Sequence, residues 1–166
     1  MKRTKNPAKE AEYRKRAADL VAQMTLHEKV SQMLSWAPAI ERLGIPAYNW
    51  WSEGIHGVGR AGTATVFPQA IGMAAAFDED MMEQVGNAVG VEARGKYNMC
   101  RAHGDRDIFK GLTVWAPNIN IFRDPRWGRG HETYGEDPFL TSRLGVRFVE
   151  GMQGDDPDYL QAAACA

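Results

Sequence analysis

Short apolar segments alternate along this chain with segments of helical periodicity, and this alternation limits the possible folds more than any other feature. Three apolar segments have the composition of strands, at residues 46–50, 111–117 and 159–166. One helical pattern starts at the acidic residues 78–80 and is expected to end near Lys96, and another starts at Pro138. The order strand, helix, strand, helix, strand predicts an α/β fold with parallel strands and helical crossovers.

Two further helical patterns precede the first predicted strand. Between Ala8 and Met24, apolar side chains recur at helical spacing. Thr25 and Glu28 have the spacing of a capping box, which predicts a second helix carrying Val30, Met33 and Leu34. We therefore expect a helical extension over residues 1–24 and one partial domain over residues 25–166.

Composition indicates an ordinary soluble globular protein of 166 residues with a net charge of −1. This charge favours neither nucleic acid nor an anionic membrane surface, and the basic run in the first sixteen residues is interpreted as a solvated helix start. No apolar stretch approaches the roughly 20 residues that span a bilayer. The N-terminus lacks the apolar core of a signal peptide. We expect a cytoplasmic protein that binds neither nucleic acid nor membrane.

The cysteines and histidines predict no metal or cofactor. Cys100 and Cys165 are too few for a disulfide framework and are not spaced as a metal-binding pair. We expect two free thiols, with Cys165 buried. Residues 103–107 alternate possible metal ligands, but Arg106 stands between two carboxylates and could neutralise them, so an ion-paired loop is expected there.

Two loops carry most of the polar and aromatic chemistry. They cover residues 51–62, after the first predicted strand, and residues 118–137, after the second. Ligands of parallel α/β sheets bind at the carboxyl ends of the strands, so we expect both loops on the same rim. Four of the five tryptophans lie beside polar or glycine-rich segments, which suggests a ligand surface: Trp50, Trp51, Trp115 and Trp127.

The second loop allows two interpretations. Residues 121–138 combine three arginines and four carboxylates with a tryptophan and a tyrosine. These charges could form ion pairs that rigidify the loop, with Asp124 and Glu132 holding arginines. They could also bind a neutral, hydroxyl-rich ligand through charge-assisted hydrogen bonds, with aromatic faces against a sugar ring. His56 and His131 could each bond a ligand hydroxyl or a backbone carbonyl.

Residues 57–62 match the G-x-G-x-x-G pattern of dinucleotide-binding proteins. That pattern binds phosphate only where it follows a strand and opens a helix. Here a β-branched segment follows, residues 63–68, and proline interrupts it. The context therefore disfavours a nucleotide site.

Several segments together resemble the N-terminal domain of glycoside hydrolase family 3. The similar segments follow the family's order and comprise residues 49–58, 65–69, 92–94 and 115–138. The resemblance extends from about Thr25 to Ala166 and is strongest to β-xylosidases and related β-glucosidases. It implies the N-terminal portion of a (β/α)8, TIM-type barrel with parallel strands, preceded by two helices.

The resemblance also implies a sugar site. Family members hydrolyse β-glycosides with retention, using a nucleophile and an acid/base carboxyl group about 5 Å apart. Arg129 matches the arginine that binds the sugar in the innermost subsite. Glu53 stands where many β-glucosidases of the family have Asp, and its longer side chain favours a pentose over a hexose. Trp115 corresponds to an aromatic wall.

No catalytic residue is assigned within this chain. In the family, a sugar-binding Lys-His pair follows the segment that matches residues 162–166, and the nucleophile and acid/base lie further on. We therefore expect part of a retaining β-glycosidase that acts on β-linked xylosides or glucosides at the non-reducing end and is inactive alone. The alternative is a non-catalytic sugar-binding or scaffold protein. An unclosed sheet leaves an unpaired edge, so self-association is also expected.

Overall fold

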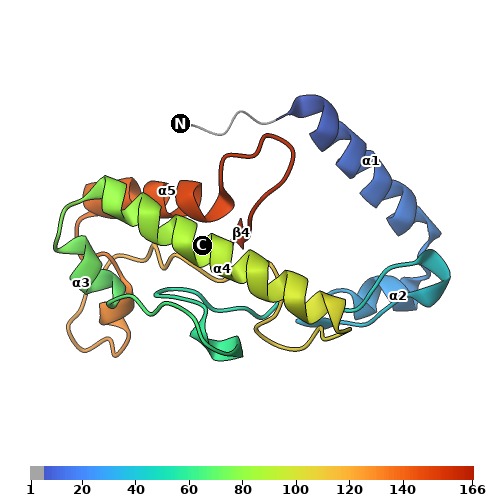
Figure 1. Ribbon diagram of the computed structural model, residues 1–166, viewed down its shortest axis with the longest axis horizontal. Coiled ribbons are helices and arrows are strands. Elements are labelled where there is room, and N and C mark those ends of the chain that lie inside the picture. The colour runs from blue at the N-terminus through green and yellow to red at the C-terminus, as the bar shows by residue number, and fades with distance from the viewer. Residues whose placement is uncertain (1–5) are drawn as a thin grey trace.

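The computed structural model describes residues 6–166 (Figure 1). The helices are α1 (Pro7–Gln23), α2 (Leu26–Ser31), α3 (Ala70–Ala74), α4 (Glu79–Ala102) and α5 (Pro138–Gln153). The strands are β1 (Trp36–Ala37), β2 (Tyr48–Asn49), β3 (Thr113–Val114) and β4 (Ala163–Ala164). Short 3-10 turns lie at η1 (Glu41–Leu43), η2 (Gly59–Ala61) and η3 (Gly130–Glu132). Within this part of the chain, no helix is long and apolar enough to cross a membrane.

Three short parallel segments form the centre of the fold. β3 and β4 pair in parallel, with Thr113 opposite Ala163. On the other side of β3, Glu53 forms a parallel bridge with Trp115, and the Trp115 N–H donates to the Ser52 carbonyl at 2.8 Å. Helices α3 and α4 connect the first parallel segment to β3, and α5 connects β3 to β4. This mixed α/β arrangement confirms the predicted alternation.

The first predicted strand pairs differently from what the pattern indicated. β2 lies within residues 46–50 but pairs antiparallel with β1, with Trp36 opposite Asn49. The Trp50 N–H donates to the Ser35 carbonyl at 2.8 Å and extends this hairpin by one residue. The prediction that residues 46–50 enter a parallel sheet was therefore wrong, because the hairpin occupies their backbone groups. The chain joins β3 only at residues 52–53.

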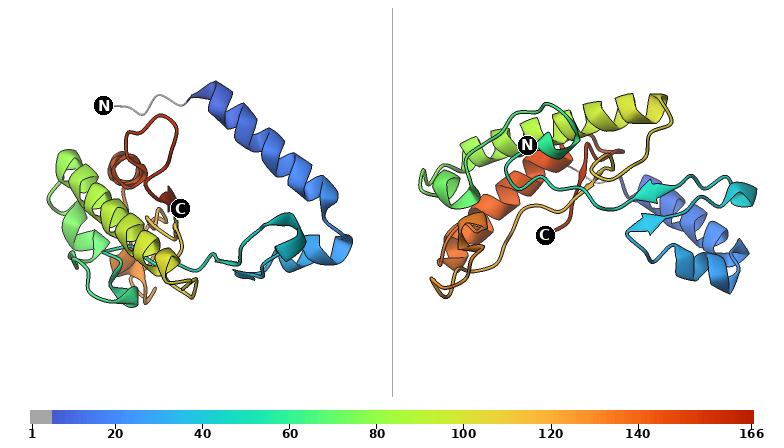
Figure 2. Two further views of the ribbon diagram at one scale, coloured as in Figure 1. Left: turned by 45° about the vertical axis from the view of Figure 1, so that its right-hand side comes forward. Right: turned by 90° about the horizontal axis from the view of Figure 1, so that it is seen from below.

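Helices α4 and α5 pack lengthwise against each other and supply most of the core (Figures 1 and 2). Glycines allow the close approach of the two backbones. A Cβ atom at Gly86 would lie 2.3 Å from the Phe148 carbonyl oxygen, and one at Gly151 would lie 2.1 Å from that of Glu83. The fully buried side chains of this interface are Met82, Val89, Leu144, Phe148 and Met152.

The helix starts follow the predictions, and one helix end does not. Asp78 caps α4 by accepting the Met81 N–H at 2.9 Å, and Asp137 caps α5, whose first residue is Pro138. The predicted end of α4 near Lys96 was wrong, because residues 97–102 contain no proline or glycine and continue the helix to Ala102. The chain leaves the helix before Gly104, which has φ +73°.

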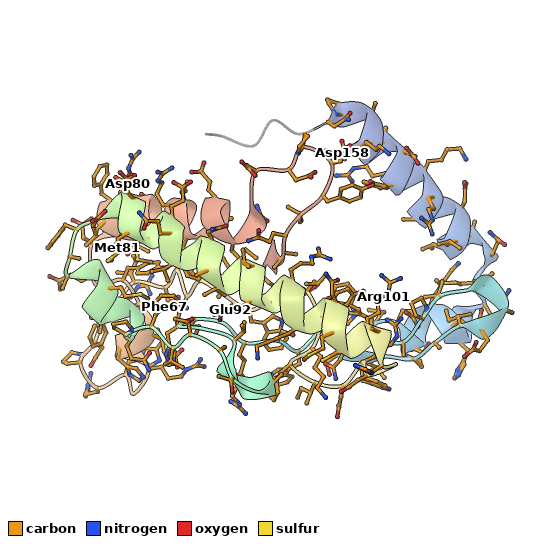
Figure 3. The ribbon with its side chains drawn as sticks, viewed as in Figure 1. Phe67, Asp80, Met81, Glu92, Arg101 and Asp158 are labelled. Atoms are coloured by element: carbon orange, nitrogen blue, oxygen red, sulfur yellow. The ribbon has the colours of Figure 1, made fainter. Side chains whose placement is uncertain are left out.

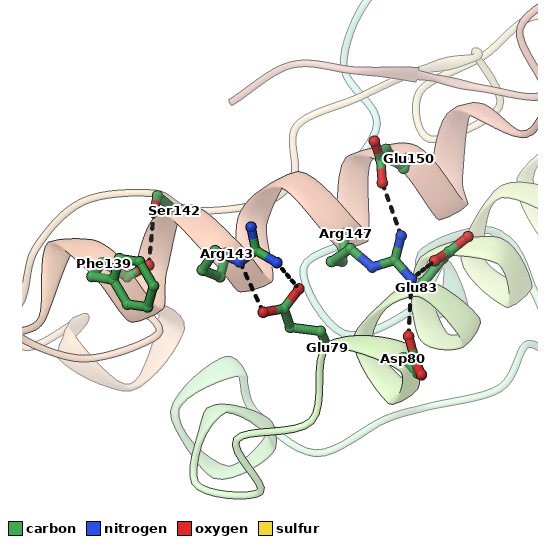
Figure 4. A network of polar contacts seen from close by, with 8 residues as sticks. All are labelled: Glu79, Asp80, Glu83, Phe139, Ser142, Arg143, Arg147 and Glu150. Carbon is green, nitrogen blue, oxygen red and sulfur yellow. Dashed lines mark hydrogen bonds and ion pairs between the residues drawn. The ribbon is translucent and has the colours of Figure 1, made fainter. Parts of the chain in front are cut away.

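Ion pairs link the solvent-facing sides of α4 and α5 (Figure 4). Arg143 of α5 donates twice to the Glu79 carboxylate of α4, each time at 2.8 Å. Arg147 of α5 reaches Glu83 and Asp80 of α4 and also Glu150 of its own helix. These contacts fix the relative rotation of the two helices above their glycine-mediated contact.

The N-terminal helices extend away from this core (Figure 2). α1 contains no buried residue, and Asn6 at its start donates to Asp158 at 2.9 Å (Figure 3). α2 has the predicted capping box, in which Thr25 and Glu28 bond each other's backbone. It ends at Ser31, earlier than expected, so that the apolar side chains of Met33 and Leu34 lie exposed beyond it.

Both cysteines are free thiols, as predicted. Cys165 is exposed, and the expectation that it is buried was wrong. Its segment is an edge: in residues 6–166, β4 pairs with β3 alone. No described element covers the other side of β4, and Cys165 follows it directly.

Candidate functional site

Glu53 is held from two sides at the rim of the parallel segments. The Trp51 indole Nε1 donates to Oε1 of Glu53 at 3.1 Å, and an Arg60 guanidinium nitrogen donates to Oε2 at 2.9 Å. The Glu53 side chain remains 40 % exposed. Its carboxylate is therefore oriented by protein partners and still accessible to a ligand.

Two indole rings lie beside Glu53. The rings of Trp51 and Trp115 have centroids 4.7 Å apart and an interplanar angle of 34°, and both are exposed. Gly54 allows this proximity, because a Cβ atom there would lie 2.5 Å from Cγ1 of Val114 in β3. The two tryptophans form an apolar surface next to a carboxylate, a combination suited to a ligand with both hydroxyl and C–H faces.

Arg129 lies in the second loop and forms a forked ion pair with Glu132. Nε donates to Oε1 at 2.9 Å and a terminal nitrogen donates to Oε2 at 2.6 Å. The hydrogen bonds from Arg129 hold the pKa of Glu132 below its usual range, against the opposing effect of burial. The Arg129 side chain is 67 % exposed, whereas that of Glu132 is only 17 % exposed. The pair therefore presents the guanidinium edge to solvent.

Glu53 and Arg129 lie within electrostatic reach of each other. The Glu132 hydrogen bond raises the pKa of Arg129, and the negative charge of Glu53 raises it further. Because Glu53 and Trp115 bridge in parallel, the two loops leave the same edge of the sheet, as the strand order predicted. Two ion pairs lie there, Arg60 with Glu53 and Arg129 with Glu132, and in each of them one positive charge balances one negative charge.

The second loop also has the internal ion pairs that the first interpretation predicted. Asp124 accepts from the Arg126 guanidinium at 2.6 Å and 3.0 Å, and Glu132 holds Arg129. Thr133 is fully buried and donates to the Gly130 carbonyl at 2.7 Å. These contacts rigidify the loop that carries Arg129.

One ring nitrogen of His56 is bonded to the backbone, as the second interpretation of this residue predicted. Its Nδ1 lies 3.1 Å from the Phe67 carbonyl oxygen, and the Phe67 N–H donates to the His56 carbonyl at 2.9 Å. His131, the other candidate, is exposed in η3.

The glycine-rich segment 57–62 serves chain packing. A Cβ atom at Gly57, where φ is +126°, would lie 2.3 Å from the Thr65 carbonyl oxygen. Glu92 extends from α4 and accepts from the Thr65 N–H and hydroxyl, and Lys96 donates to the carbonyls of residues 61 and 63 (Figure 3). The segment contains the 3-10 turn η2, and the next α-helix, α3, starts only at Ala70. It lacks the helix start that a nucleotide site requires.

The possible metal ligands at residues 103–107 do not form a cluster. Asp105 accepts from Lys110 at 2.6 Å, so the ion pair expected there is made by Lys110 and not by Arg106. Among the described residues, no three His, Cys, Asp or Glu side chains are grouped as metal ligands.

Comparison with known proteins places this chain in a family. The model of the glycosyl hydrolase family 3 N-terminal domain matches residues 16–163, and the chain therefore belongs to that family. It is 50 % identical to a probable β-D-xylosidase 7 of Arabidopsis thaliana, over 91 % of this chain and 21 % of that protein. It is 49 % identical to a xylan 1,4-β-xylosidase of Xylanibacter ruminicola, over 92 % of this chain and 18 % of that protein.

Solved structures agree with this family. A family 3 exo-β-xylosidase in complex with a xylobiose aziridine probe matches with a TM-score of 0.77 and 38 % identity, over 90 % of this chain and 20 % of that one. DesR, a β-glucosidase from Streptomyces venezuelae in complex with D-glucose, matches with a TM-score of 0.63 and 34 % identity, over 84 % and 18 %. The chain thus spans about a fifth of the length of the relatives it matches.

Sequence reasoning proposed Glu53, Trp115 and Arg129 as site residues and anticipated Glu132 as a partner of an arginine, but it did not anticipate the partners of Glu53. Arg60 lies in the glycine-rich segment 57–62, which was considered from the sequence only as a phosphate-binding motif. Phe109, whose ring centroid lies 4.5 Å from the Arg60 guanidinium carbon, was not considered as a site residue. The sequence offered one indication for Arg60, a positive charge seven residues after Glu53. It offered no indication that Phe109 would lie beside Arg60.

Proposed function

We propose that this chain is the N-terminal part of a retaining β-glycosidase that acts on β-linked xylosides or glucosides at the non-reducing end. The convergence of Glu53, Trp115 and Arg129 supports this proposal. Glu53 and Trp115 bridge in parallel beside two exposed indole rings, and Arg129 lies in the loop that follows Trp115, where the charge of Glu53 contributes to its raised pKa. The names of the relatives, β-xylosidases and β-glucosidases, favour the same substrates.

The parallel segments are proposed to be the first strands of a (β/α)8 barrel. Residues 52–53, β3 and β4 follow each other in space in the order of the chain, with helices between them. In such barrels, ligands bind at the carboxyl ends of the strands, where Glu53 and Trp115 lie. The helices α1 and α2 precede this barrel portion.

Each residue of the proposed site has a distinct chemical role. The Glu53 carboxylate accepts hydrogen bonds from sugar hydroxyls, and the Arg129 guanidinium donates to the oxygens of the same sugar ring. Trp115 covers the C–H face of the ring. The length of Glu53 compared with aspartate favours a pentose, because it leaves less room for an exocyclic hydroxymethyl group.

The first test of this proposal is sugar binding by the chain itself. Titration of 15N-labelled chain with xylose should shift the indole signals of Trp51 and Trp115. Glu53→Gln and Arg129→Met should each weaken binding at least about tenfold, because each removes a charge-assisted hydrogen bond. Arg126→Met is the matched control, since Arg126 pairs with Asp124 in the same loop. Equal affinity in all four proteins would contradict the proposed site.

The second test is turnover. No residue of this chain is assigned as nucleophile or acid/base, so the purified chain should not release aryl alcohol from aryl β-xylosides or β-glucosides. Hydrolysis that Arg129→Met abolishes would show that the chain has its own catalytic pair. The chain can also be joined to the remaining segments of a relative. Sugar binding without turnover by that fusion protein would favour the non-catalytic alternative.

A further inference from the structure

We infer that Arg60 is a positioning residue of the proposed sugar site, holding Glu53 away from Arg129 so that a sugar ring can enter between them. The inference rests on the proposed function for its purpose. Its geometric part, the orientation of Glu53 by Arg60, stands independently of any ligand. Phe109 is the platform that fixes Arg60.

Two contacts fix the Arg60 guanidinium in direction and in plane. One nitrogen donates to Oε2 of Glu53 at 2.9 Å, and the guanidinium carbon lies 4.5 Å from the centroid of the Phe109 ring. The Arg60 side chain is 61 % exposed, and an exposed ion pair alone orients its partners weakly. Stacking on an aromatic face adds a second constraint, which arginine can satisfy together with the ion pair.

The backbone of Phe109 has a conformation that places the ring there. Its φ is +66°, in the left-handed region that bulky side chains rarely occupy. Its N–H donates to the Trp51 carbonyl at 2.8 Å, which ties this conformation to the segment that carries Glu53. Such strained residues occur preferentially at functional sites, where surrounding contacts retain them. Here the Phe109 hydrogen bond to Trp51 holds the aromatic ring on which the Arg60 guanidinium lies.

The charges around Glu53 make this support necessary. Arg60 forms an ion pair with Glu53, whereas Arg129 is paired with Glu132 and interacts with Glu53 only through its charge. If Arg60 were replaced by an uncharged residue, Glu53 would lose its ion pair, and we expect the charge of Arg129 to draw it away from Trp51. That movement would break the Trp51 hydrogen bond to Oε1 and close the space between the two sugar-binding groups.

The Trp51 indole N–H provides a readout that needs no ligand. Its NMR signal reports the hydrogen bond to Glu53, and Trp51→Phe assigns it among the five tryptophans. Arg60→Met should shift this signal because Glu53 leaves its position. Arg60→Lys, which retains the charge, should restore it in part, and Phe109→Leu should shift it in the same direction. Arg126→Met should leave it unchanged.

Xylose titration of the same variants tests the consequence for the site. Arg60→Met should weaken xylose binding about fivefold, the effect of losing one well-oriented exposed ion pair. Thermal unfolding of each variant is compared with that of Arg126→Met, so that a folding defect is recognised. Where Arg60→Met is destabilised, the Arg60→Lys and Phe109→Leu variants carry the test.

The outcomes separate the two proposals. An unchanged Trp51 signal and unchanged affinity in Arg60→Met would overturn the positioning role, even if Glu53→Gln weakens binding and the sugar site stands. A shifted Trp51 signal in a chain that binds no xylose would support the positioning of Glu53 and contradict the sugar site in the isolated chain. A shifted signal together with weaker binding supports both.

Discussion

At the scale of residues, arginines orient the carboxylates of Glu53 and Glu132. How exposed each carboxylate remains determines whether it can accept a ligand. Glu132 is largely shielded and serves to orient Arg129. Glu53 shares its two oxygens between Trp51 and Arg60 and remains accessible. Sequence reasoning predicted the first arrangement because the partners lie three residues apart in one loop. It did not predict the second, because Glu53 and Arg60 meet through a turn whose geometry depends on Gly57.

Glu28 gives the clearest pH dependence among these carboxylates. Hydrogen bonds from Arg42, and then from Thr25, lower its pKa from 4.5 to about 2. A lowered pKa in the folded state means that the folded state favours the ionised form. The stabilising contribution of Glu28 is therefore complete above about pH 4.5, declines as the pH falls, and is lost near pH 2.

Amide hydrogen exchange in α2 measures this contribution. Protection of α2 should decrease between pH 4.5 and pH 2 in the wild type, after correction for intrinsic exchange rates. In Glu28→Gln, protection should be lower at pH 6 and should change less over the same interval. An identical pH profile in both proteins would show that the Arg42 pair does not stabilise α2.

At the scale of elements, the contact between α4 and α5 depends on glycines at which no other residue fits. The spacing of the apolar positions predicted both helices, and the aspartate caps predicted where they start. The glycines were not recognisable as contact positions, because glycine inside a helix is unfavourable by propensity alone. The tertiary contact explains them, since the backbone of the other helix occupies the space of a side chain.

Gly151→Ala tests this contact, and Gly95→Ala is its matched control. A Cβ atom at Gly151 would lie 2.1 Å from the Glu83 carbonyl oxygen and 2.8 Å from the Asn87 nitrogen, so α4 and α5 must separate. We expect a loss of about 1–3 kcal/mol in the free energy of unfolding. Gly95 lies in α4 with no atom within 4 Å of the same position, so alanine should stabilise by about 0.5–1 kcal/mol. Urea denaturation compares the variants, and equal effects would argue against the close contact.

At the scale of the whole molecule, β4 is an open edge of the sheet as far as residues 6–166 are concerned. The N–H groups of Ala163 and Cys165 donate to carbonyls of the β3 segment, so the backbone groups of Ala164 face the opposite, unpaired edge. An apolar groove of about 470 Å³ lies beside it, between α5 and the loop after β3, and includes Ile119, Val146 and Ala166 in its lining. An unpaired edge next to exposed apolar surface favours association between chains.

We therefore predict concentration-dependent self-association of the isolated chain. Sedimentation velocity should show species larger than the monomer, and a reductant excludes disulfide formation through the exposed thiol of Cys165. Cys165→Lys should reduce association, because a lysine at a sheet edge opposes strand pairing. Cys165→Ser should associate like the wild type. A monodisperse monomer at all concentrations would contradict the prediction.

The sequence by itself determined the alternation of strands and helices, the helix starts, the family, and the identity of three proposed sugar-binding residues. These features depend on local chemistry: periodicity, capping side chains and short motifs. The tertiary structure decided where residues 46–50 pair, how far α4 continues, that Cys165 is exposed, and that Arg60 and Phe109 support Glu53. Each of these depends on which backbone groups and side chains meet across the fold. Local sequence carries little information about such contacts, because residues distant along the chain compete to make them.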